Sequence, residues 1–249
     1  MTVAPSAPGD VSRTIHPADE MFKTAKISLP ELGKASAYYF SSGALVASKV
    51  EQYLRSVAFD PARMSLLDFA CGYGRVTRHF AKVFQEIVCS DLDPDMLRFV
   101  EEITGAAGFL SNVELEKVNW PARRFDVVFS FSLFTHLNPA IWEPWFWALS
   151  EMVEPGGLMF ISTRGVEFAK RTGEPVQDGE RVRFTEKNET AGRLDKAIYG
   201  QTTLAREFVD DVLAKHPGRM ARLAYFQGGE FDSYQDMHVL TRATDAAAP

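Results

Sequence analysis

The segment LLDFACGYG, residues 66–74, places an acid and two closely spaced glycines in and after an apolar run. Gly72 and Gly74 suit a turn where backbone must approach a ligand closely, because glycine has no side chain in the way. A second acid, Asp91, follows Gly72 by 19 residues and ends the next apolar run. An acid at this distance can accept hydrogen bonds from both ribose hydroxyls. Together, these residues favour an adenosine-containing ligand.

Two other ligands fit these residues less well. The full dinucleotide fingerprint has a third glycine three residues after the second, and here that position is Thr77. The acids of DLDPDM, residues 91–96, have the spacing of a calcium loop, with Glu102 in the twelfth position. The sixth position of such a loop needs glycine for a sharp turn, but it is Met96, and Pro94 favours a helix start. We therefore expect no calcium site.

Alternating strand and helix patterns must position these residues. Apolar runs predict strands, and apolar residues at spacings of three and four predict helices. The strands are predicted at residues 64–69, 86–91, 112–118, 125–132, 157–163, 221–227 and 236–242, and the helices at residues 35–57, 74–84, 94–103, 141–153 and 204–216. Strands that alternate with helices indicate a parallel sheet covered on both faces, and the last two strands indicate an antiparallel hairpin at one edge.

The composition narrows the class of protein. The chain has 249 residues, 46% of them apolar, and a net charge of −6, so its charge disfavours nucleic acid as a partner. Its two cysteines and five histidines show no metal-ligand spacing. No apolar run reaches the roughly 18 residues of a membrane span, and the N-terminus lacks the order of a signal peptide. We expect a soluble, cytoplasmic protein that binds no metal and acts as a monomer or homodimer.

The pattern divides the chain into five parts. Residues 1–16 form a Pro/Ala/Ser-rich tail that we expect to be disordered, and residues 17–60 a helical cap. Residues 61–163 form the ligand-binding core. Residues 164–202 are polar and irregular, as expected of a substrate-side insertion. Residues 203–249 supply a helix and a strand pair that complete the core.

Residues 66–163 resemble the class I S-adenosylmethionine-dependent methyltransferases. Five features appear in the family's order: the glycine segment, the acid of the second strand, the pair Asn119-Trp120, the segment RFDVVFSFSLFTHL and the segment SEMVEPGGLMFIST. The segments YFSSG, FTHL, YGQTTLAREFV and YQDMHVL resemble those of a bacterial subset associated with methylation of sugars, glycans or other small secondary metabolites. The resemblance implies a Rossmann-like α/β fold with a mostly parallel seven-stranded sheet.

The resemblance also implies the ligand and its contacts. The cofactor would be S-adenosyl-L-methionine, with S-adenosyl-L-homocysteine as the product. Ala70 stands where the family usually has its first glycine, and Asn119 stands where an aspartate is commoner. The expected cofactor-binding residues are Asp68, Ala70, Cys71, Gly72, Gly74, Arg75, Asp91, Leu92, Asn119, Trp120, Ser130 and Phe131.

The acceptor side is less constrained by sequence. A hydroxyl acceptor must lose a proton, and His136, just past the fourth strand, could take it. His136 could instead cap the helix that follows, or be a core residue with satisfied hydrogen bonds. The expected substrate-binding residues are Tyr39, Arg164, Tyr199 and His238. For His238 a polar face on an edge strand is the simpler interpretation. Two other functions stay open: a non-catalytic adenosine-binding module and an NAD-dependent oxidoreductase.

Overall fold

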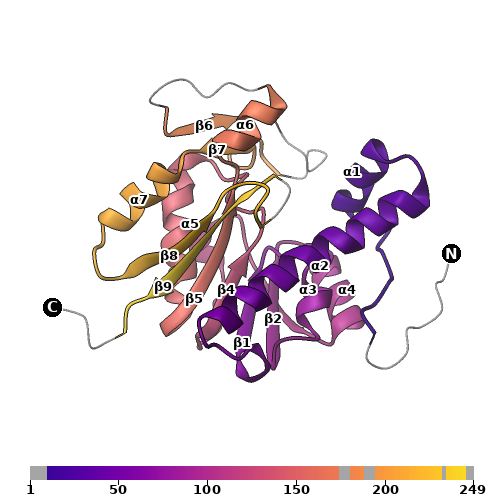
Figure 1. Cartoon of the computed structure of the whole chain (residues 1–249), viewed down its shortest axis with the longest axis horizontal. Helices are drawn as coiled ribbons and strands as arrows, with labels where there is room; N and C mark the ends of the chain where they lie inside the picture. Colours follow the sequence, from indigo (N-terminus) through magenta and orange to yellow (C-terminus); the bar gives the residue numbers. More distant parts are fainter. Residues whose placement is uncertain (1–9, 174–179, 188–193, 232–233, 245–249) are drawn as a thin grey trace. The chain divides into compact units, whose positions relative to one another are not determined.

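A computed structural model describes residues 10–173, 180–187, 194–231 and 234–244 (Figure 1). The chain forms two compact units, residues 1–121 and 122–249. Together they contain the predicted mostly parallel seven-stranded sheet, so the α/β fold class is confirmed. The first unit contributes strands in the order β3-β2-β1 and the second contributes β4-β5-β9-β8.

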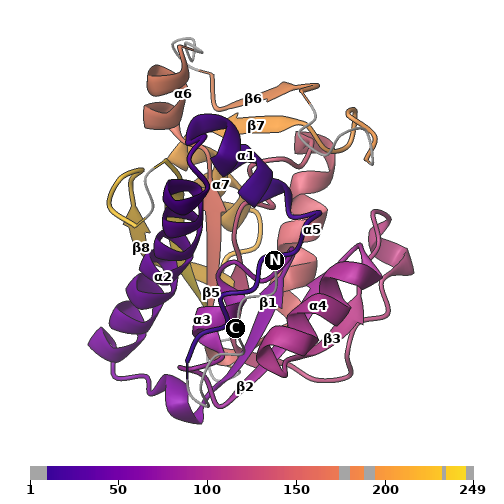
Figure 2. The ribbon, with the colours of Figure 1, turned by 90° about the vertical axis from the view of Figure 1, so that its right-hand side faces the viewer.

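The first unit begins with helices and continues with a strand–helix alternation. Its elements are α1 Glu20–Ser28, α2 Leu32–Ser56, the 3-10 helix η1 Pro61–Arg63, β1 Ser65–Phe69, α3 Thr77–Phe80, β2 Glu86–Asp91, α4 Pro94–Thr104, β3 Ala107–Leu110 and the 3-10 helix η2 Leu115–Lys117. Pro94 lies in the first turn of α4, and the side chain of Asp93 caps it by accepting from the N–H of Asp95. Figure 2 shows α4 beside β2 and β3, against which it packs.

The third strand was wrongly predicted at residues 112–118. Gly105 ends α4 in the left-handed conformation, and the chain enters β3 two residues later. β3 pairs with β2 in parallel, Ala107 opposite Val88 and Leu110 opposite Asp91. The alternating residues after Asn112 then lie beyond this pairing and form η2 instead. The short segment directly after α4 thus forms the third strand, and the more regular alternation of residues 112–118 lies outside the sheet.

The second unit completes the alternation and adds the hairpin. Its elements are β4 Phe125–Ser130, α5 Pro139–Glu151, β5 Val153–Thr163, α6 Val166–Thr172, β6 Val182–Thr185, β7 Gln201–Leu204, α7 Arg206–Ala214, β8 Met220–Phe226 and β9 Asp236–Arg242. β4 and β5 are parallel, and β9 pairs antiparallel with both β5 and β8. β6 and β7 form a separate antiparallel pair. The predicted C-terminal hairpin is therefore present, with β8 as its outer strand.

The aromatic stretch of α5 is a packing element. Trp142 and Phe146 are fully buried, their rings stacked with centroids 5.5 Å apart. Phe134 and Phe208 contact the Trp142 ring from outside the helix. Burial of such rings contributes roughly 1.5–3 kcal/mol per side chain, so this segment stabilises the unit rather than offering stacking faces to a ligand.

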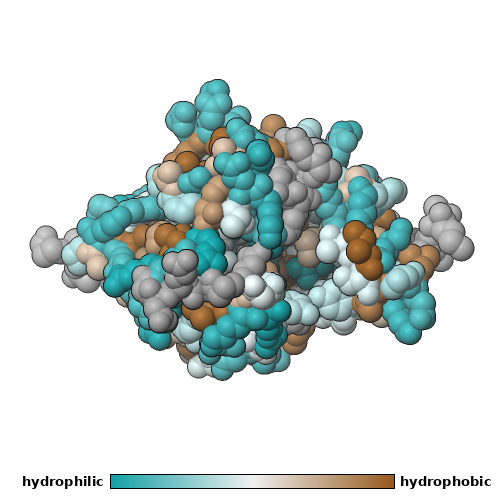
Figure 3. Space-filling view, turned by 90° about the horizontal axis from the view of Figure 1, so that it is seen from above, coloured by the Kyte–Doolittle hydropathy of each residue, from teal (hydrophilic) through white to brown (hydrophobic). Residues whose placement is uncertain are grey.

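The surface is mainly hydrophilic on the face drawn in Figure 3, where hydrophobic residues form small patches. Scattered apolar residues of this kind are ordinary on a protein surface. In the part of the chain that the structure describes, no helix is both long and apolar enough to cross a membrane.

Candidate active site

In the turn after β1, every second residue has a left-handed backbone conformation. Ala70, Gly72 and Gly74 have φ values of 63°, 55° and 71°. The N–H groups of Ala70 and Cys71 both donate to the carbonyl of Ser90, which ties the start of the turn to β2. Left-handed backbone favours glycine, so Ala70 carries strain that glycine would not. The predicted glycine turn is present and held by the neighbouring strand.

Asp91 fixes the middle of this turn. One carboxylate oxygen accepts from the N–H of Gly72 at 2.8 Å, and the other accepts from the N–H of Leu92 at 2.7 Å. Burial raises the pKa of Asp91 above its ordinary value, while these N–H groups oppose the rise. The N–H of Asp93 also reaches this carboxylate, and a carboxylate has about four lone-pair sites, so Asp91 retains capacity for a further donor such as a hydroxyl. The two acids of the sequence motif are thus at one end of adjacent strands.

Asp68 lies beneath the turn on β1. It is 3% exposed and accepts a 2.6 Å hydrogen bond from the Thr77 hydroxyl. Burial raises the pKa of Asp68 to about 7, against the effect of Thr77, and the nearby charge of Asp91 adds to the rise. This carboxyl therefore changes protonation near neutral pH. A cationic group brought close to it would favour the ionised form.

Two other predicted residues of the turn face different surroundings. The thiol of Cys71 lies 3.6 Å from the carbonyl of Gly72. Its contact with the Cys89 thiol, together with burial, raises the pKa of Cys71. The guanidinium of Arg75 donates to the Ser42 hydroxyl on α2 at 2.9 Å. Arg75 therefore connects the turn to α2, whereas Cys71 is held protonated within it.

The remaining predicted cofactor residues of the first unit follow β2 and η2. Leu92 is half-buried directly after Asp91, and Asn119 is exposed. The Trp120 ring stacks on Phe69 of β1, with centroids 5.5 Å apart and planes 19° from parallel. This stacking sets Trp120 against the strand that leads into the glycine turn. A flat ring next to such a turn suits contact with a planar group.

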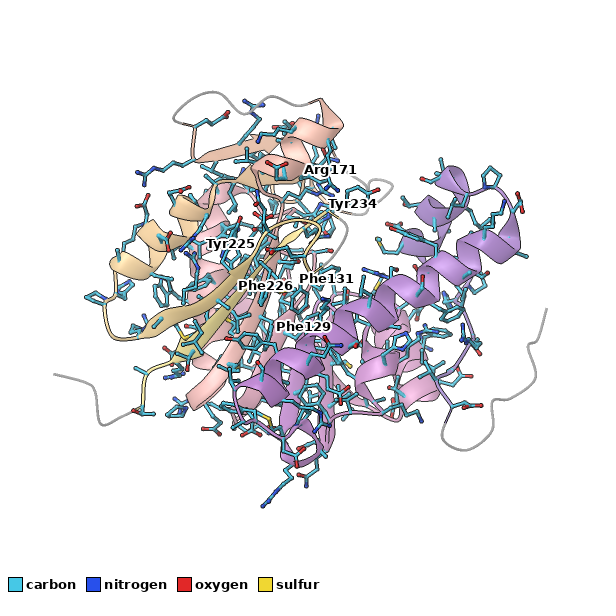
Figure 4. The ribbon with its side chains drawn as sticks, in the orientation of Figure 1. Phe129, Phe131, Arg171, Tyr225, Phe226 and Tyr234 are labelled. Carbon is cyan, nitrogen blue, oxygen red and sulfur yellow. The ribbon has the colours of Figure 1, made fainter. Side chains whose placement is uncertain are left out.

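In the second unit, the chain turns sharply after β4. Ser130 is fully buried, and its hydroxyl has no hydrogen-bond partner within the described residues. Phe131 stacks on Phe129 with centroids 6.0 Å apart (Figure 4). Ser132 has a φ of 71°, held by a 2.7 Å bond from its N–H to the Ser162 hydroxyl on β5. This hydrogen bond to β5 thus fixes the backbone of the turn that follows β4.

His136 follows this turn and has a defined orientation. It is 6% exposed, and its Nδ1 lies 2.7 Å from the carbonyl oxygen of Gly200. A carbonyl only accepts, so Nδ1 carries the proton and Nε2 is the acceptor nitrogen. The Tyr199 ring stacks on His136 with centroids 4.6 Å apart. The structure therefore brings together two residues predicted separately, His136 and Tyr199. The side chain that caps α5 is Asn138, so the capping role considered for His136 is not the one observed.

The other predicted substrate residues of the second unit lie around β5 and β9. Arg164 is 8% exposed directly after β5, with its guanidinium over the Phe168 ring at 4.9 Å. His238 is fully buried, and its Nε2 lies 3.0 Å from the Thr163 hydroxyl. Burial, then Arg222 and Arg206, lower the pKa of His238 well below its ordinary value. The edge-strand interpretation of His238 is wrong, because β8 covers β9 and makes it an interior strand.

Tyr39 occupies a different environment from the one expected of a substrate contact. It is 1% exposed in α2, and its hydroxyl donates to the carboxylate of Asp19 at 2.5 Å. Burial and the charge of Asp19 raise the pKa of Tyr39. Asp19 also caps α1 by accepting from the N–H of Phe22. Tyr39 thus fixes the start of α1.

Two polar residues next to the predicted site have partners that no pattern in the sequence indicated. Gln235, just before β9, donates from Nε2 to the Ser132 hydroxyl at 2.8 Å, while its buried Oε1 has no partner in the described residues. Asp236 accepts from the N–H of Gly228 and the hydroxyl of Tyr225. Gln235 and Ser132 are 103 residues apart, so no local pattern could have paired them.

Metal ligation is not supported by the described side chains. Within those residues, no group of three or more His, Cys, Asp or Glu side chains could hold a metal ion. The oxygens of Asp91 are engaged by backbone N–H groups, and Asp93 caps α4. The acids that mimic a calcium loop in sequence therefore have other partners.

Part of this chain is similar in sequence to known methyltransferases. Residues 66–157 match the model of the family described as "Methyltransferase domain". A ubiquinone biosynthesis O-methyltransferase of Cereibacter sphaeroides is 29% identical over 103 residues, which are 40% of this chain and 41% of that protein. The chain therefore spans about two fifths of the length of the curated relatives it matches.

Solved structures share the fold over most of the chain. An S-adenosylmethionine-dependent methyltransferase from Clostridium acetobutylicum is 14% identical, with a TM-score of 0.56 over 80% of this chain and 91% of that one. CalS10, an amino pentose methyltransferase from Micromonospora echinaspora, is 20% identical, with a TM-score of 0.54 over 82% of this chain and 92% of that one. Residues 66–157 are therefore similar to a methyltransferase domain, and the chain shares the fold of these solved methyltransferases.

Proposed function

We propose that this protein transfers a methyl group from S-adenosylmethionine to a hydroxyl of a small-molecule acceptor, such as a sugar, glycan or secondary metabolite. The observation that carries this proposal is the Asp91 carboxylate, which holds the glycine turn through Gly72 and retains acceptor capacity. That arrangement suits the two hydroxyls of an adenosine ribose.

The residues of the first unit fit the parts of this cofactor. Backbone at Gly72 and Gly74 would approach its methionine portion, and Trp120 and Asn119 would contact its adenine. When bound, S-adenosylmethionine supplies a methyl group on a sulfonium leaving group. The pKa of Asp68 is about 7, so the positive charge of a bound ligand nearby would favour its ionised form. The ionised carboxylate would in turn attract that positive charge. Cys71, Arg75 and Leu92 complete the proposed cofactor contacts of this unit.

In the second unit, His136 supports a hydroxyl acceptor. Its Nδ1 is protonated toward Gly200, so Nε2 is the nitrogen able to take a proton from an attacking hydroxyl. We assign His136 as the general base on this tautomer. Tyr199 holds the ring in place by stacking, and Arg164 and His238 remain proposed acceptor-side residues.

The unpartnered oxygen of Gln235 favours the same acceptor chemistry. A buried carbonyl oxygen without a donor is unfavourable by roughly 1–3 kcal/mol, so a hydroxyl that donates to it would be recognised, whereas a carboxylate would be repelled. The similarity to an O-methyltransferase and to an amino pentose methyltransferase agrees with a hydroxyl-bearing small molecule. A non-catalytic adenosine-binding module is the second candidate, because the cofactor turn alone does not establish turnover.

Calorimetric titration of S-adenosylhomocysteine tests the cofactor assignment. We expect wild-type protein to bind it and Asp91→Ala to bind it at least about tenfold more weakly, because charge-assisted hydrogen bonds to ribose are lost. NADH is the control ligand. Binding of NADH without binding of S-adenosylhomocysteine would overturn the proposal in favour of an oxidoreductase.

The acceptor chemistry has its own test. Wild-type protein and His136→Gln are incubated with methyl-tritiated S-adenosylmethionine and a small-molecule extract of bacterial cells. We expect base-stable label, as in a methyl ether, and at least about a hundredfold less of it with His136→Gln. Base-labile label would indicate a methyl ester and contradict the hydroxyl acceptor. Cofactor binding without any labelled product would favour the non-catalytic module.

A further inference from the structure

Residues 12–16 lie against the glycine turn. The contact between them is not among the five sequence features that the chain shares with methyltransferases. Arg78, on α3, is 1% exposed and directs its guanidinium at backbone carbonyls in two distant parts of the chain. Nε donates to Gly74 at 2.9 Å and Nη2 to Tyr73 at 3.1 Å. Nη1 donates to Ser12 at 3.1 Å and Thr14 at 2.7 Å. One buried side chain therefore joins the turn to the N-terminal segment.

Arginine suits this position for reasons of geometry. Its planar guanidinium presents five N–H donors in a fixed fork, whereas lysine presents a single ammonium that cannot reach carbonyls on both sides. The guanidinium also lies over the rings of Tyr39 and Phe40, at 5.5 and 5.3 Å. Burial lowers the pKa of Arg78, and the charge of Asp19 opposes that change. No described acid forms an ion pair with Arg78, so its orientation depends on the four carbonyls.

A second contact reaches the turn from the same segment. The His16 ring stacks on Tyr73, with centroids 4.4 Å apart and planes 8° from parallel. Tyr73 stands between Gly72 and Gly74, and its ring also meets Phe99 of α4. The N-terminal segment thus contacts the glycine turn by stacking as well as through Arg78.

The segment is anchored at its other positions too. Arg13 lies over the Phe40 ring at 4.8 Å. Asp19 accepts the Tyr39 hydroxyl and caps α1, which fixes the chain immediately after the segment. Ser12, Arg13, Thr14 and His16, expected from composition to belong to a disordered tail, therefore have defined partners in the first unit.

We propose that residues 12–16 are part of the cofactor site, and that Arg78 is a positioning residue that makes their docking and cofactor binding mutually dependent. The inference rests on the proposed function, since the ligand is S-adenosylhomocysteine or its methylated form. Groups that hold the same turn stabilise each other, so a ligand that orders Tyr73 and Gly74 strengthens the hold of Arg78 on Ser12 and Thr14. Loosening the segment must weaken the ligand by the same factor.

The test uses the full chain with trypsin, which cleaves after the exposed Arg13. Cleavage after Arg13 requires the segment to release its hydrogen bonds to Arg78, which the ligand strengthens. We expect S-adenosylhomocysteine to slow this cleavage by about tenfold or more, the factor that corresponds to one or two charge-assisted bonds. Cleavage after the exposed Lys187, in the second unit, should stay unchanged.

Arg78→Lys is compared with Arg98→Lys, a matched replacement at an exposed arginine that pairs with Asp95 on α4. We expect Arg78→Lys to bind S-adenosylhomocysteine at least about tenfold more weakly and to lose the ligand's protection of Arg13. Arg98→Lys should match wild type in both measurements. Should Arg78→Lys fail to fold, His16→Ala, which removes the stacking on Tyr73, is expected to show the same pair of effects.

The outcomes separate this inference from the proposed function. Wild-type affinity in Arg78→Lys, or cleavage after Arg13 that the ligand leaves unchanged, would overturn the role of residues 12–16. If wild-type protein binds no S-adenosylhomocysteine, the proposed function fails. In that case faster cleavage after Arg13 in Arg78→Lys would still establish that Arg78 holds the segment, and an unchanged rate would overturn that too.

Discussion

The N–H of Gly72 donates to the carboxylate of Asp91 at 2.8 Å, so the acid that ends β2 holds the turn that follows β1. Asp91 therefore has two roles that sequence alone does not separate. It shapes the glycine turn, and it offers acceptor capacity at the same place. Changes to this residue should affect the turn and the ligand together.

Replacing Asp91 by asparagine should separate charge from shape. The asparagine side chain is nearly isosteric but neutral, and its amide nitrogen cannot accept a hydrogen bond from Gly72 or Leu92. We expect Asp91→Asn to lower S-adenosylhomocysteine affinity by about tenfold or more, because charge-assisted bonds are the stronger kind. Calorimetry measures this, with Asp93→Asn as the control, since Asp93 caps α4. Equal losses in both variants would contradict a direct role for Asp91.

The raised pKa of Asp68 predicts a pH dependence of stability. The carboxyl has its ordinary pKa of 3.8 when unfolded and about 7 when folded, so the folded state holds the extra proton between these values. Its contribution to the free energy of unfolding therefore falls as pH rises from about 4 to about 7, and is constant above that. Thermal melts at pH 5, 6, 7 and 8 should show that Asp68→Asn removes this component. Parallel melting curves for wild type and variant across this range would refute the shift.

Gly43 allows α2 to approach the glycine turn. A Cβ at this position would lie 2.2 Å from the carbonyl oxygen of Arg75, so Gly43→Ala must displace backbone. We expect a loss of about 1–3 kcal/mol, or several degrees in Tm. Gly33→Ala, also in α2, is the control, because a Cβ there meets nothing within 4 Å. It should preserve or raise Tm, since alanine favours helix over glycine.

Ala70 is expected to gain from replacement by glycine. Its φ of 63° is strained for a residue with a Cβ, and relief of about 1 kcal/mol should raise Tm by a few degrees. Ala58→Gly is the matched control, because Ala58 has a φ of 64° at the end of α2, outside the turn. Both variants should be more stable, but only Ala70→Gly should change S-adenosylhomocysteine affinity. A lower Tm for both would show that chain entropy outweighs the strain.

In the second unit, Gly165 gives Asp236 its space. A Cβ on Gly165 would lie 1.9 Å from the Asp236 carboxylate, which holds Gly228 and Tyr225. Gly165→Ala should therefore lower the free energy of unfolding by about 1–3 kcal/mol. In an Asp236→Ala background the same change should have little further effect, because the colliding group is gone. Additive losses in the double variant would disprove this steric relation.

Much of the fold followed from local patterns. The strands at residues 86–91 and 236–242 and the helix beginning at Pro94 are those that the sequence predicts, because period-two apolar runs, proline at a helix start and a capping acid act within a few residues. The third strand was misplaced for the converse reason. Its position depends on where α4 ends at Gly105 and on pairing with β2, not on its own alternation.

The sequence by itself determined the alternation of strands and helices in the core, the glycine turn and its two acids, because these depend on short-range spacing and on the parallel sheet that it implies. Only the tertiary structure decided which side chains those groups meet. The carbonyl of Gly200 fixes the tautomer of His136, and Gln235 donates to the hydroxyl of Ser132. Arg78 donates both to the glycine turn and to Thr14. Partners 60 or more residues apart are chosen by packing and hydrogen bonding in three dimensions, which no local spacing encodes.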